Sequence, residues 1–179
     1  YDADGNQTNR GALEGATSYD WSSDNKLVQV VGPSGSWQNG YDAQGNRTCV
    51  VDDSTLREFV IDPTGLRNVV SEYELGGLSV WFEHGLGLAS RSDSANGNGF
   101  YTFDGLGSAS ELAGGDSTPW NTYAYLPFGE MPFRSQVVED AFQYVGNAGV
   151  MADKANLSLM RARSYSPEWG RFLSPDPLG

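Results

Sequence analysis

The chain has 179 residues and a formal net charge of −12, from 23 acidic and 11 basic side chains, and this charge opposes binding to nucleic acids and anionic lipid surfaces. Its single cysteine excludes an intrachain disulfide framework, and no apolar stretch approaches the ~18 residues that a membrane-spanning helix needs. We therefore expect no nucleic-acid partner and no membrane span.

The composition favours β-structure. Hydrophobic residues make up 39% of the chain, and 5 Trp, 9 Tyr and 8 Phe supply much of this apolar mass. The 23 glycines, together with Tyr, Trp, Val and Thr, are typical of short strands joined by tight turns.

An eight-residue repeat opens the chain. The sequence YDADGNQT beginning at Tyr1 recurs as YDAQGNRT beginning at Tyr41, with six identities in eight positions, and a degenerate copy begins at Tyr19. The copies begin 18 and 22 residues apart, which is the length of two short strands and two turns. We expect the tyrosine in a strand, the Gly-Asn pair in a turn with glycine at positive φ, and the residues that follow in the returning strand.

A single hairpin cannot bury its own face, so successive copies must pair edge to edge. The repeat therefore predicts an all-β fold, a continuous antiparallel ribbon of β-hairpins. Tyr1 and Tyr41 are expected as structural residues of a tyrosine ladder on one face of this ribbon.

From residue 56 the repeat loosens, but the β pattern continues. Strands are predicted at 57–61, 68–74, 78–84, 100–103 and 122–125. Turn sequences rich in Gly, Asp and Asn separate them, at 62–65, 76–77, 93–99, 104–107 and 114–116. The best helical candidate is a short one at 108–113.

Patterns for metal binding and for nucleophilic catalysis are weak. Cys49 and His84 form no recognisable catalytic motif, and a lone thiol in a strand is typical of a small buried hydrophobe. The DADGN segment resembles a calcium loop, but the position twelve from Asp2 is Leu13 instead of the bidentate Glu of an EF-hand. We expect no metal and no cofactor. Tyr and Trp exposed on a sheet could bind glycan, although the repeat predicts them chiefly as ladder residues.

A series of motifs leads to the C-terminus. The first five are FEHGLG, YTFDGLGS, TYAYLPFG, FQYVG and LMRARSY, at 82–87, 101–108, 122–129, 142–146 and 159–165. The last stretch, 161–179, reads RARSYSPEWGRFLSPDPLG. With the YD repeats, these motifs resemble, in the same order, the core of the Rhs (rearrangement hotspot, YD-repeat) family over nearly the whole chain. The departures are small: Ser164 stands where a second aromatic is usual, and Asn147 replaces a common charged residue.

The resemblance implies a β-ribbon that spirals into a hollow shell, with a core domain that plugs or closes one end. In bacterial Rhs proteins and related insecticidal toxin-complex components this shell encloses a C-terminal toxin, whereas in animal teneurins a similar barrel serves cell-surface adhesion. We expect three segments: YD-repeat hairpins at 1–55, core hairpins at 56–135, and a C-terminal core or plug segment at 136–179. The start inside a repeat indicates a piece of a longer protein.

The function implied by this resemblance is structural. The chain is expected to be a shell segment that encapsulates or presents a polypeptide, a secreted toxin in a bacterial delivery system, and to be secreted or located at the cell surface. Its expected partners are the rest of its parent shell or identical copies, joined through exposed strand edges, and an enclosed C-terminal toxin. Two alternatives stay open: a parent protein that cleaves itself, and an extracellular adhesion or fibre protein with YD repeats and no cargo.

Asp176 is the candidate catalytic residue. In self-cleaving members of the family, an Asp-Pro-x-Gly motif belongs to an aspartyl autoprotease, whose chemistry needs two neighbouring carboxylates, one acid and one base. The family supplies the second carboxylate from a downstream motif that this sequence does not contain, so Asp176 is half of a site. The similar DPTGL at 62–66 is expected to be a hairpin turn, with Pro at its usual turn position.

The remaining candidates come from the same C-terminal stretch. Three arginines of this stretch are expected either to line the plug and orient Asp176 or Glu168 through bidentate pairs, or to form surface and inter-strand salt bridges: Arg161, Arg163 and Arg171. Trp169 is expected as a core anchor.

Overall fold

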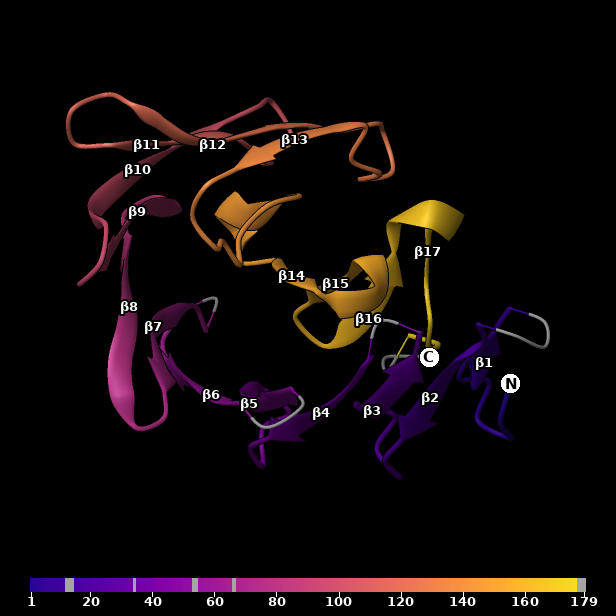
Figure 1. Ribbon diagram of the computed structural model, residues 1–179. Helices are drawn as coiled ribbons and strands as arrows, with labels where there is room; N and C mark the ends of the chain where they lie inside the picture. Colours follow the sequence, from indigo (N-terminus) through magenta and orange to yellow (C-terminus); the bar gives the residue numbers. More distant parts are fainter. Residues whose placement is uncertain (12–14, 34, 53–54, 66, 177–179) are drawn as a thin grey trace.

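The computed structural model describes residues 1–11, 15–33, 35–52, 55–65 and 67–176, and within these ranges the strands form two antiparallel sheets (Figure 1). The large sheet contains 13 strands, β1 (Asn9–Arg10), β2 (Thr17–Trp21), β3 (Leu27–Gly32), β4 (Gly35–Tyr41), β5 (Arg47–Asp52), β6 (Thr55–Ile61), β7 (Val69–Glu74), β8 (Gly77–His84), β9 (Leu88–Asp93), β10 (Gly97–Phe103), β11 (Ala109–Gly114), β12 (Pro119–Ala124) and β13 (Phe133–Gln136). The small sheet contains four, β14 (Met151–Asp153), β15 (Leu157–Met160), β16 (Arg163–Ser166) and β17 (Arg171–Phe172). In both sheets each strand pairs with the strand that follows it in the chain. The predicted all-β ribbon of antiparallel hairpins is confirmed.

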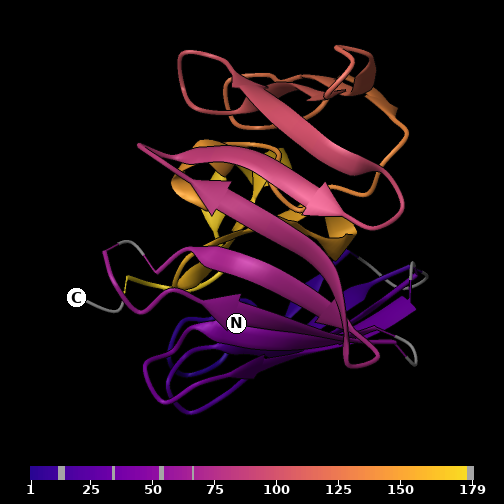
Figure 2. The same ribbon diagram turned by 90° about the vertical axis from the view of Figure 1, so that its left-hand side faces the viewer.

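The 13-stranded ribbon is strongly curved, and the small sheet lies on its concave side (Figures 1 and 2). The two ends of the chain meet, because the backbone N–H of Gln7 donates to the carbonyl of Leu173 at 2.8 Å. Close by, a Cβ at Gly5 would lie 3.2 Å from Cγ of Pro175. The ribbon therefore wraps around the last segment of its own chain.

The turns along one edge of the ribbon share one construction. In the turn that begins at Asp42, the backbone N–H of Asp42 donates to the carbonyl of Asn46 at 2.9 Å, and the Asp42 carboxylate accepts from the N–H groups of Gln44 and Asn46 at 2.9 and 2.8 Å. Gly45 has φ of 77°, which glycine adopts without steric cost. The backbone bond that closes this turn recurs in the turns that begin at residues 2, 22 and 104. Asp, or Ser at residue 22, opens each of these turns, and Gly, or Asn at residue 25, takes the positive φ three residues later, so these residue types determine where the hairpins reverse.

The copy of the repeat predicted at Tyr19 is displaced by two residues. Ser22, which follows Trp21, begins the second turn, and its N–H donates to the carbonyl of Lys26 at 2.9 Å. Trp21 therefore occupies the position of Tyr41, and the copies at residues 1, 21 and 41 are 20 residues apart instead of 18 and 22. The Tyr-Asp pair at 19–20 lies within β2, because the turn geometry and not the residue pair fixes the register.

β-Bulges accompany these turns and bend the ribbon. The register shifts at 20/21, 40/41, 60/61 and 102/103, one or two residues before each turn begins. A bulge increases local twist and bends its strand. Because bulges recur at the same place in successive hairpins, they curve the sheet in one direction. This curvature brings Trp37, Phe59 and Phe82 into one buried core.

The prediction of a short helix at 108–113 is wrong. Residues Ala109–Gly114 form β11, which pairs with β10 and β12, and Ala109 and Leu112 are fully buried. Burial between two strands overrides the helical propensity of this sequence. The described helices are three 3₁₀ turns, η1 (Gly146–Ala148), η2 (Lys154–Asn156) and η3 (Pro167–Trp169). None of them is long and apolar enough to cross a membrane.

Candidate functional site

The contact between the concave face of the ribbon and the segment after β13 is the candidate functional site. Phe142 of this segment is fully buried and meets the ring of Phe82 edge to face, with 4.9 Å between ring centroids and 87° between ring planes. Aromatic pairs of this kind contribute about 0.5–1.5 kcal/mol beyond the burial of their area. The core joins further apolar side chains of both parts, Leu27, Val50 and Leu88 from the ribbon and Met151, Leu157, Leu159 and Leu173 from the segment. Hydrophobic burial thus holds the segment inside the curve.

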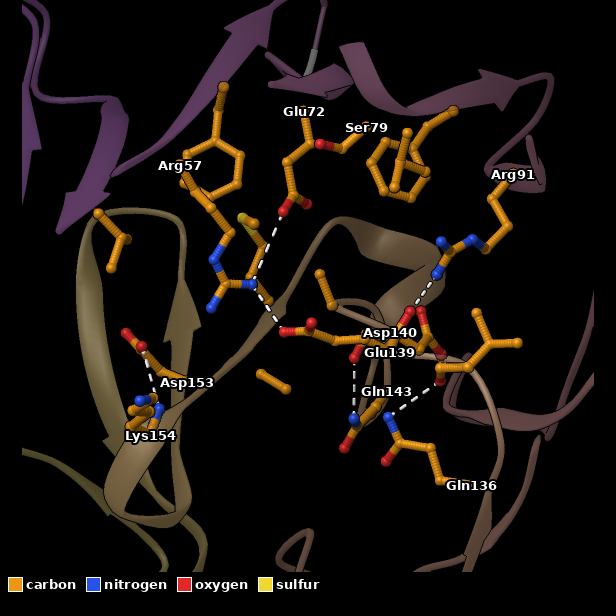
Figure 3. A pocket seen from close by; sticks show the side chains of 18 of the residues that line it. Arg57, Glu72, Ser79, Arg91, Gln136, Glu139, Asp140, Gln143, Asp153 and Lys154 are labelled. Carbon is orange, nitrogen blue, oxygen red and sulfur yellow. Dashed lines mark hydrogen bonds and ion pairs between the residues drawn. The ribbon is translucent and has the colours of Figure 1, made fainter. Parts of the chain in front are cut away.

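A cavity of about 980 Å³ opens beside this core, and many of its lining side chains are charged (Figure 3). Arg57 of β6 lies between two carboxylates, 3.6 Å from Glu72 of β7 and 2.7 Å from Glu139. Since Glu139 follows β13, the arginine links the ribbon to the C-terminal segment.

Glu72 is the buried carboxylate of this group. Its side chain is 10% exposed, compared with 78% for Glu139. Burial raises the pKa of the Glu72 carboxyl, Arg57 lowers it, and the negative charge of Glu139 raises it further. Glu72 therefore relies on Arg57 for charge compensation.

A second link between ribbon and segment is centred on Asp140, which is buried. The Tyr101 hydroxyl donates to Asp140 Oδ1 at 2.7 Å, the Tyr123 hydroxyl donates to Oδ2 at 3.3 Å, and the backbone N–H of Phe142 donates to Oδ1 at 3.1 Å. Burial raises the pKa of Asp140, and the hydrogen bond from Tyr101 opposes this shift. Arg91 of β9 donates to the neighbouring carbonyl of Glu139. The start of the segment is therefore fastened to three strands of the ribbon.

Two further ion pairs attach η2 and β14 to β5. Arg47 Nη1 lies 2.5 Å from Asp153 Oδ2, with both side chains buried, and Lys154 pairs with Asp52. Four carboxylates that line the cavity therefore each have a basic or phenolic partner: Glu72, Glu139, Asp140 and Asp153. The arrangement is suited to fastening one chain segment to another.

Asp176 and Arg163 are brought together by the structure. Arg163 Nη2 lies 3.2 Å from Asp176 Oδ2, and the Arg163 guanidinium lies 3.7 Å from the centroid of the Phe172 ring. The Asp176 side chain is 53% exposed, and its neighbour Pro175 lies against Gly5 in the first turn of the chain. The residues that complete the terminal motif, 177–179, lie outside the described residues.

Arg161 lies at a different place from Asp176. It occupies the turn between β15 and β16 with φ of 59°, and its guanidinium donates to the carbonyl of Arg67 at 3.3 Å and to Asn68 Oδ1 at 3.1 Å. It also donates to the carbonyl of Ala148. These contacts join the β15–β16 turn to the β6–β7 turn.

Two arginine side chains lie close to the ring of Trp169. The guanidinium of Arg10 lies 5.2 Å and that of Arg171 lies 5.7 Å from its ring centroid. Trp169 is half-buried and packs against the main core, while Arg171 is exposed. The glutamate that the terminal arginines were expected to orient, Glu168, pairs with Arg10 of β1.

The two tyrosines of the repeat differ in their surroundings. The Tyr41 hydroxyl donates to the carbonyl of Leu27 at 2.9 Å, and burial raises the pKa of Tyr41 to about 12. Tyr1 is 72% exposed and precedes the first described strand. Tyr41 is therefore a contact between neighbouring hairpins, whereas Tyr1 lies at the open end of the ribbon.

The interpretation of Asp62 as a turn residue is confirmed. Its carboxylate accepts from the backbone N–H and the hydroxyl of Thr64, at 2.9 and 2.7 Å, as in the other Asp turns. Leu66, the last residue of that motif, lies outside the described residues. Cys49 is partly buried in β5, and His84 contacts the carbonyl of Val69 through Nε2 at 2.8 Å. The described residues contain no group of three or more His, Cys, Asp or Glu side chains arranged to hold a metal ion.

Sequence reasoning missed the charged residues of the cavity. One signal was present in the repeat: Arg47 and Arg57 stand 20 residues after Leu27 and Trp37, which are fully buried. A charge at a position that is apolar in the preceding copy indicates an inward polar group. Glu139 and Asp140 lie outside the repeat, so no such signal marks them.

The fold is a curved antiparallel ribbon with a small sheet on its concave side, and solved structures share this fold. A Photorhabdus luminescens Tc holotoxin pore carrying a point mutation in TccC3 matches 100% of this chain at 16% identity, with a TM-score of 0.73. Crystal structures of TcdB2-TccC3-TEV and TcdB2-TccC3 match 91% of it at 14% and 15% identity, with TM-scores of 0.69 and 0.68. The chain spans 9% of the length of the matched chain in each of these structures. No protein-family model and no curated protein matches the chain.

At these identities the likeness is one of fold. It agrees with the antiparallel ribbon of hairpins that the resemblance to Rhs proteins implies, and it extends over the ribbon and the C-terminal segment.

Proposed function

We propose that this chain is a wall and closing segment of a β-shell that encloses or presents a polypeptide, a secreted toxin in a bacterial delivery system. The fold that it shares with Tc toxin components supports the proposal. Its role is structural, because the carboxylates of Glu139, Asp140 and Asp153 in the central cavity are each engaged in holding two parts of the chain together.

The observation that carries this proposal is that the concave face already holds polypeptide. It binds the C-terminal segment through the Phe82–Phe142 contact and through the ion pair of Arg57 with Glu139. A face that combines an apolar core with inward charged groups can hold an extended chain by burial and by hydrogen bonds together.

We propose that the three segments expected from the sequence each form one part of this shell. Segments 1–55 and 56–135 would form one curved wall, since β6 spans the boundary between them, and segment 136–179 would be the closure. β1 and β13 end the described sheet, and all four residues of β13 are exposed. We propose that such open edges join the rest of the parent shell or an identical copy, outside the producing cell or at its surface.

Limited proteolysis of the parent polypeptide tests the proposal. An enclosed cargo should resist digestion for as long as the shell is folded, and it should be digested rapidly once the shell is unfolded in denaturant. Digestion of the cargo at the same rate as the isolated cargo would overturn encapsulation. Binding of the intact protein to cell surfaces without any protected segment would favour the adhesion alternative instead.

We propose self-cleavage of the parent as a second candidate function. Asp176 is half-exposed and held by Arg163, so it is accessible to a second carboxylate from a following segment. In the parent polypeptide, Asp176→Asn should abolish release of the C-terminal part. Release at the unchanged rate would reject the acid–base role of Asp176, without affecting the proposed structural role.

A further inference from the structure

The last strand of the ribbon, β13, has an open edge. Among the described strands it pairs with β12 alone, and six consecutive residues, 132–137, are exposed. The chain then leaves the sheet, because Val138 is buried and Asp140 accepts a hydrogen bond from Tyr101. Figure 1 shows this segment turning toward the concave side of the ribbon. The residues that follow β13 therefore do not cover its edge.

The hydrogen bonds to β12 define which backbone groups of β13 face the open edge. The N–H of Val137 donates to the carbonyl of Trp120 at 3.0 Å. Alternate residues of an antiparallel strand bond to the same neighbour, so the backbone groups of Arg134 and Gln136 point away from β12. Pro132 has no N–H and ends this row of donors. The open edge therefore offers the N–H and C=O groups of Arg134 and Gln136.

The side chains of this strand follow a symmetrical pattern. The sequence FRSQV at 133–137 has an apolar residue at each end, a long polar residue beside each, and serine in the centre. Phe133 and Val137 are 53% and 78% exposed. Arg134 and Gln136 line the large cavity and lie on the concave face, so Phe133, Ser135 and Val137 lie on the convex face. The stretch contains no acidic residue, although the net charge of the chain is −12.

We propose that β13 pairs with β13 of a second copy of this chain, antiparallel and about a twofold axis at Ser135. Arg134 of one copy then lies opposite Gln136 of the other, and the two residues exchange both backbone hydrogen bonds. Phe133 lies opposite Val137 of the other copy, an aromatic and β-branched pair of the kind that stabilises antiparallel sheets. This pairing rests on the proposed joining of open edges, and it names the partner and the register.

The neighbouring registers are less favourable. A shift of two residues in one direction places Arg134 opposite Arg134 and Gln136 opposite Pro132, which has no N–H. A shift of two residues in the other direction separates Phe133 from Val137. In the proposed register the two Arg134 residues are only diagonal neighbours, about 7–8 Å apart between Cα atoms, which reduces their repulsion. The residue types of this edge therefore favour one register.

A contact between the two copies tests this register directly. In a mixture of isotope-labelled and unlabelled full chain, the Phe133 ring should show intermolecular NOEs to the methyl groups of Val137. Within one copy these residues are four positions apart on a strand, about 13 Å, which is too far for an NOE. This measurement needs no substitution, so it does not depend on the folding of a variant.

Sedimentation equilibrium of the full chain and of two variants gives the second test. At ~0.15 M salt the long-range repulsion between copies is screened, and the short edge should give a dissociation constant on the order of 0.1–1 mM. Gln136→Glu should tighten the dimer about two- to thirtyfold, because it places a carboxylate opposite Arg134 at two symmetrical positions. Gln136→Arg places like charges there and should weaken the dimer by a similar factor.

Matched controls separate this effect from other consequences of the substitutions. Gln38→Glu and Gln38→Arg make the same changes of charge at an exposed position of β4, inside the sheet, and should leave the dissociation constant nearly unchanged. The Gln136 side chain also donates to the carbonyl of Val138 at 3.1 Å. Loss of that bond would not change the dimer in opposite directions in the two variants. Amide NMR spectra verify that each variant is folded.

Three results would overturn the proposal: a chain that stays monomeric up to about 1 mM, a dimer without the contact between Phe133 and Val137, or equal responses to the Gln136 and Gln38 substitutions. A monomeric chain would leave the edge of β13 to the rest of the parent shell. Protected cargo with a monomeric chain would reject the pairing alone, whereas unprotected cargo with the predicted dimer would reject encapsulation alone.

Discussion

Arg57 and Glu139 are 82 positions apart in the chain, yet the Arg57 guanidinium donates to the Glu139 carboxylate at 2.7 Å. The same guanidinium lies 3.6 Å from Glu72, which is buried in the ribbon. One arginine therefore compensates a carboxylate of the curved ribbon and binds a carboxylate of the segment that the ribbon encloses.

Substitution of Arg57 should lower the free energy of unfolding more than substitution of its exposed partner Glu139. Arg57→Gln leaves the buried Glu72 carboxylate without its cation, and the free energy of unfolding should fall by about 1–3 kcal/mol. Glu139→Gln is the matched change on the exposed side and should have a clearly smaller effect. Urea denaturation of both variants measures the difference, and equal losses would show that Arg57 does not compensate Glu72.

The raised pKa of Glu72 predicts a pH dependence of stability. The folded state binds this proton more tightly than the unfolded state, whose pKa is about 4.3. The contribution of Glu72 is therefore fully present below pH ~4.3 and is lost as the pH rises through the folded pKa. Glu72→Gln removes this loss, so the variant should gain unfolding free energy relative to the original chain between pH ~4 and pH ~7. Parallel stability curves for the two proteins would contradict the assignment.

The hydroxyl of Tyr101 should stabilise the start of the C-terminal segment. Tyr101→Phe removes the 2.7 Å hydrogen bond to the buried Asp140 and should cost about 1–3 kcal/mol. It should also speed hydrogen exchange at the Phe142 amide, which donates to the same carboxylate. Tyr125→Phe is the control, because the buried Tyr125 hydroxyl has no hydrogen-bond partner among the described residues. Similar losses in both variants would rule out a specific role for the Tyr101 bond.

The turn glycines should differ in their tolerance of a side chain. Gly45→Ala places a Cβ at φ of 77° and should destabilise the chain by about 1–2 kcal/mol. Gly115→Ala is the control, since Gly115 does not have a positive φ and a Cβ there meets nothing within 4 Å. Thermal unfolding of both variants measures the effect. Equal melting temperatures would show that positive φ at Gly45 does not set the turn.

The ribbon could be predicted from the sequence because its determinants are local. A turn such as that at Asp42 needs only an Asp, whose carboxylate accepts from the N–H groups two and four residues later, and a glycine at the third position after it, and both are visible in the repeat. The register predicted at Tyr19 was wrong. The prediction followed the Tyr-Asp pair at 19–20, whereas the hydrogen-bonded turn begins at Ser22, so the true copy of the repeat begins at Trp21.

The site could not be predicted because its contacts are distant in sequence. Nothing near Asp140 indicates that Tyr101 will reach it, 39 positions earlier in the chain, and burial of both depends on the curvature of the whole sheet. Asp176 was singled out by a family motif, and the structure adds Arg163 as its partner.

A double-mutant cycle between Phe82 and Phe142 tests most directly whether the ribbon encloses its own C-terminal segment. Phe82→Leu, Phe142→Leu and the double variant should show a coupling free energy of about 0.5–1.5 kcal/mol in urea denaturation, as expected for an edge-to-face aromatic pair. A parallel cycle that pairs Phe100→Leu with Phe142→Leu is the control. Because Phe100 is 50% exposed, the effects of these two substitutions should be additive. If the Phe82 and Phe142 effects were additive as well, the segment would not lie in the concave face of the ribbon.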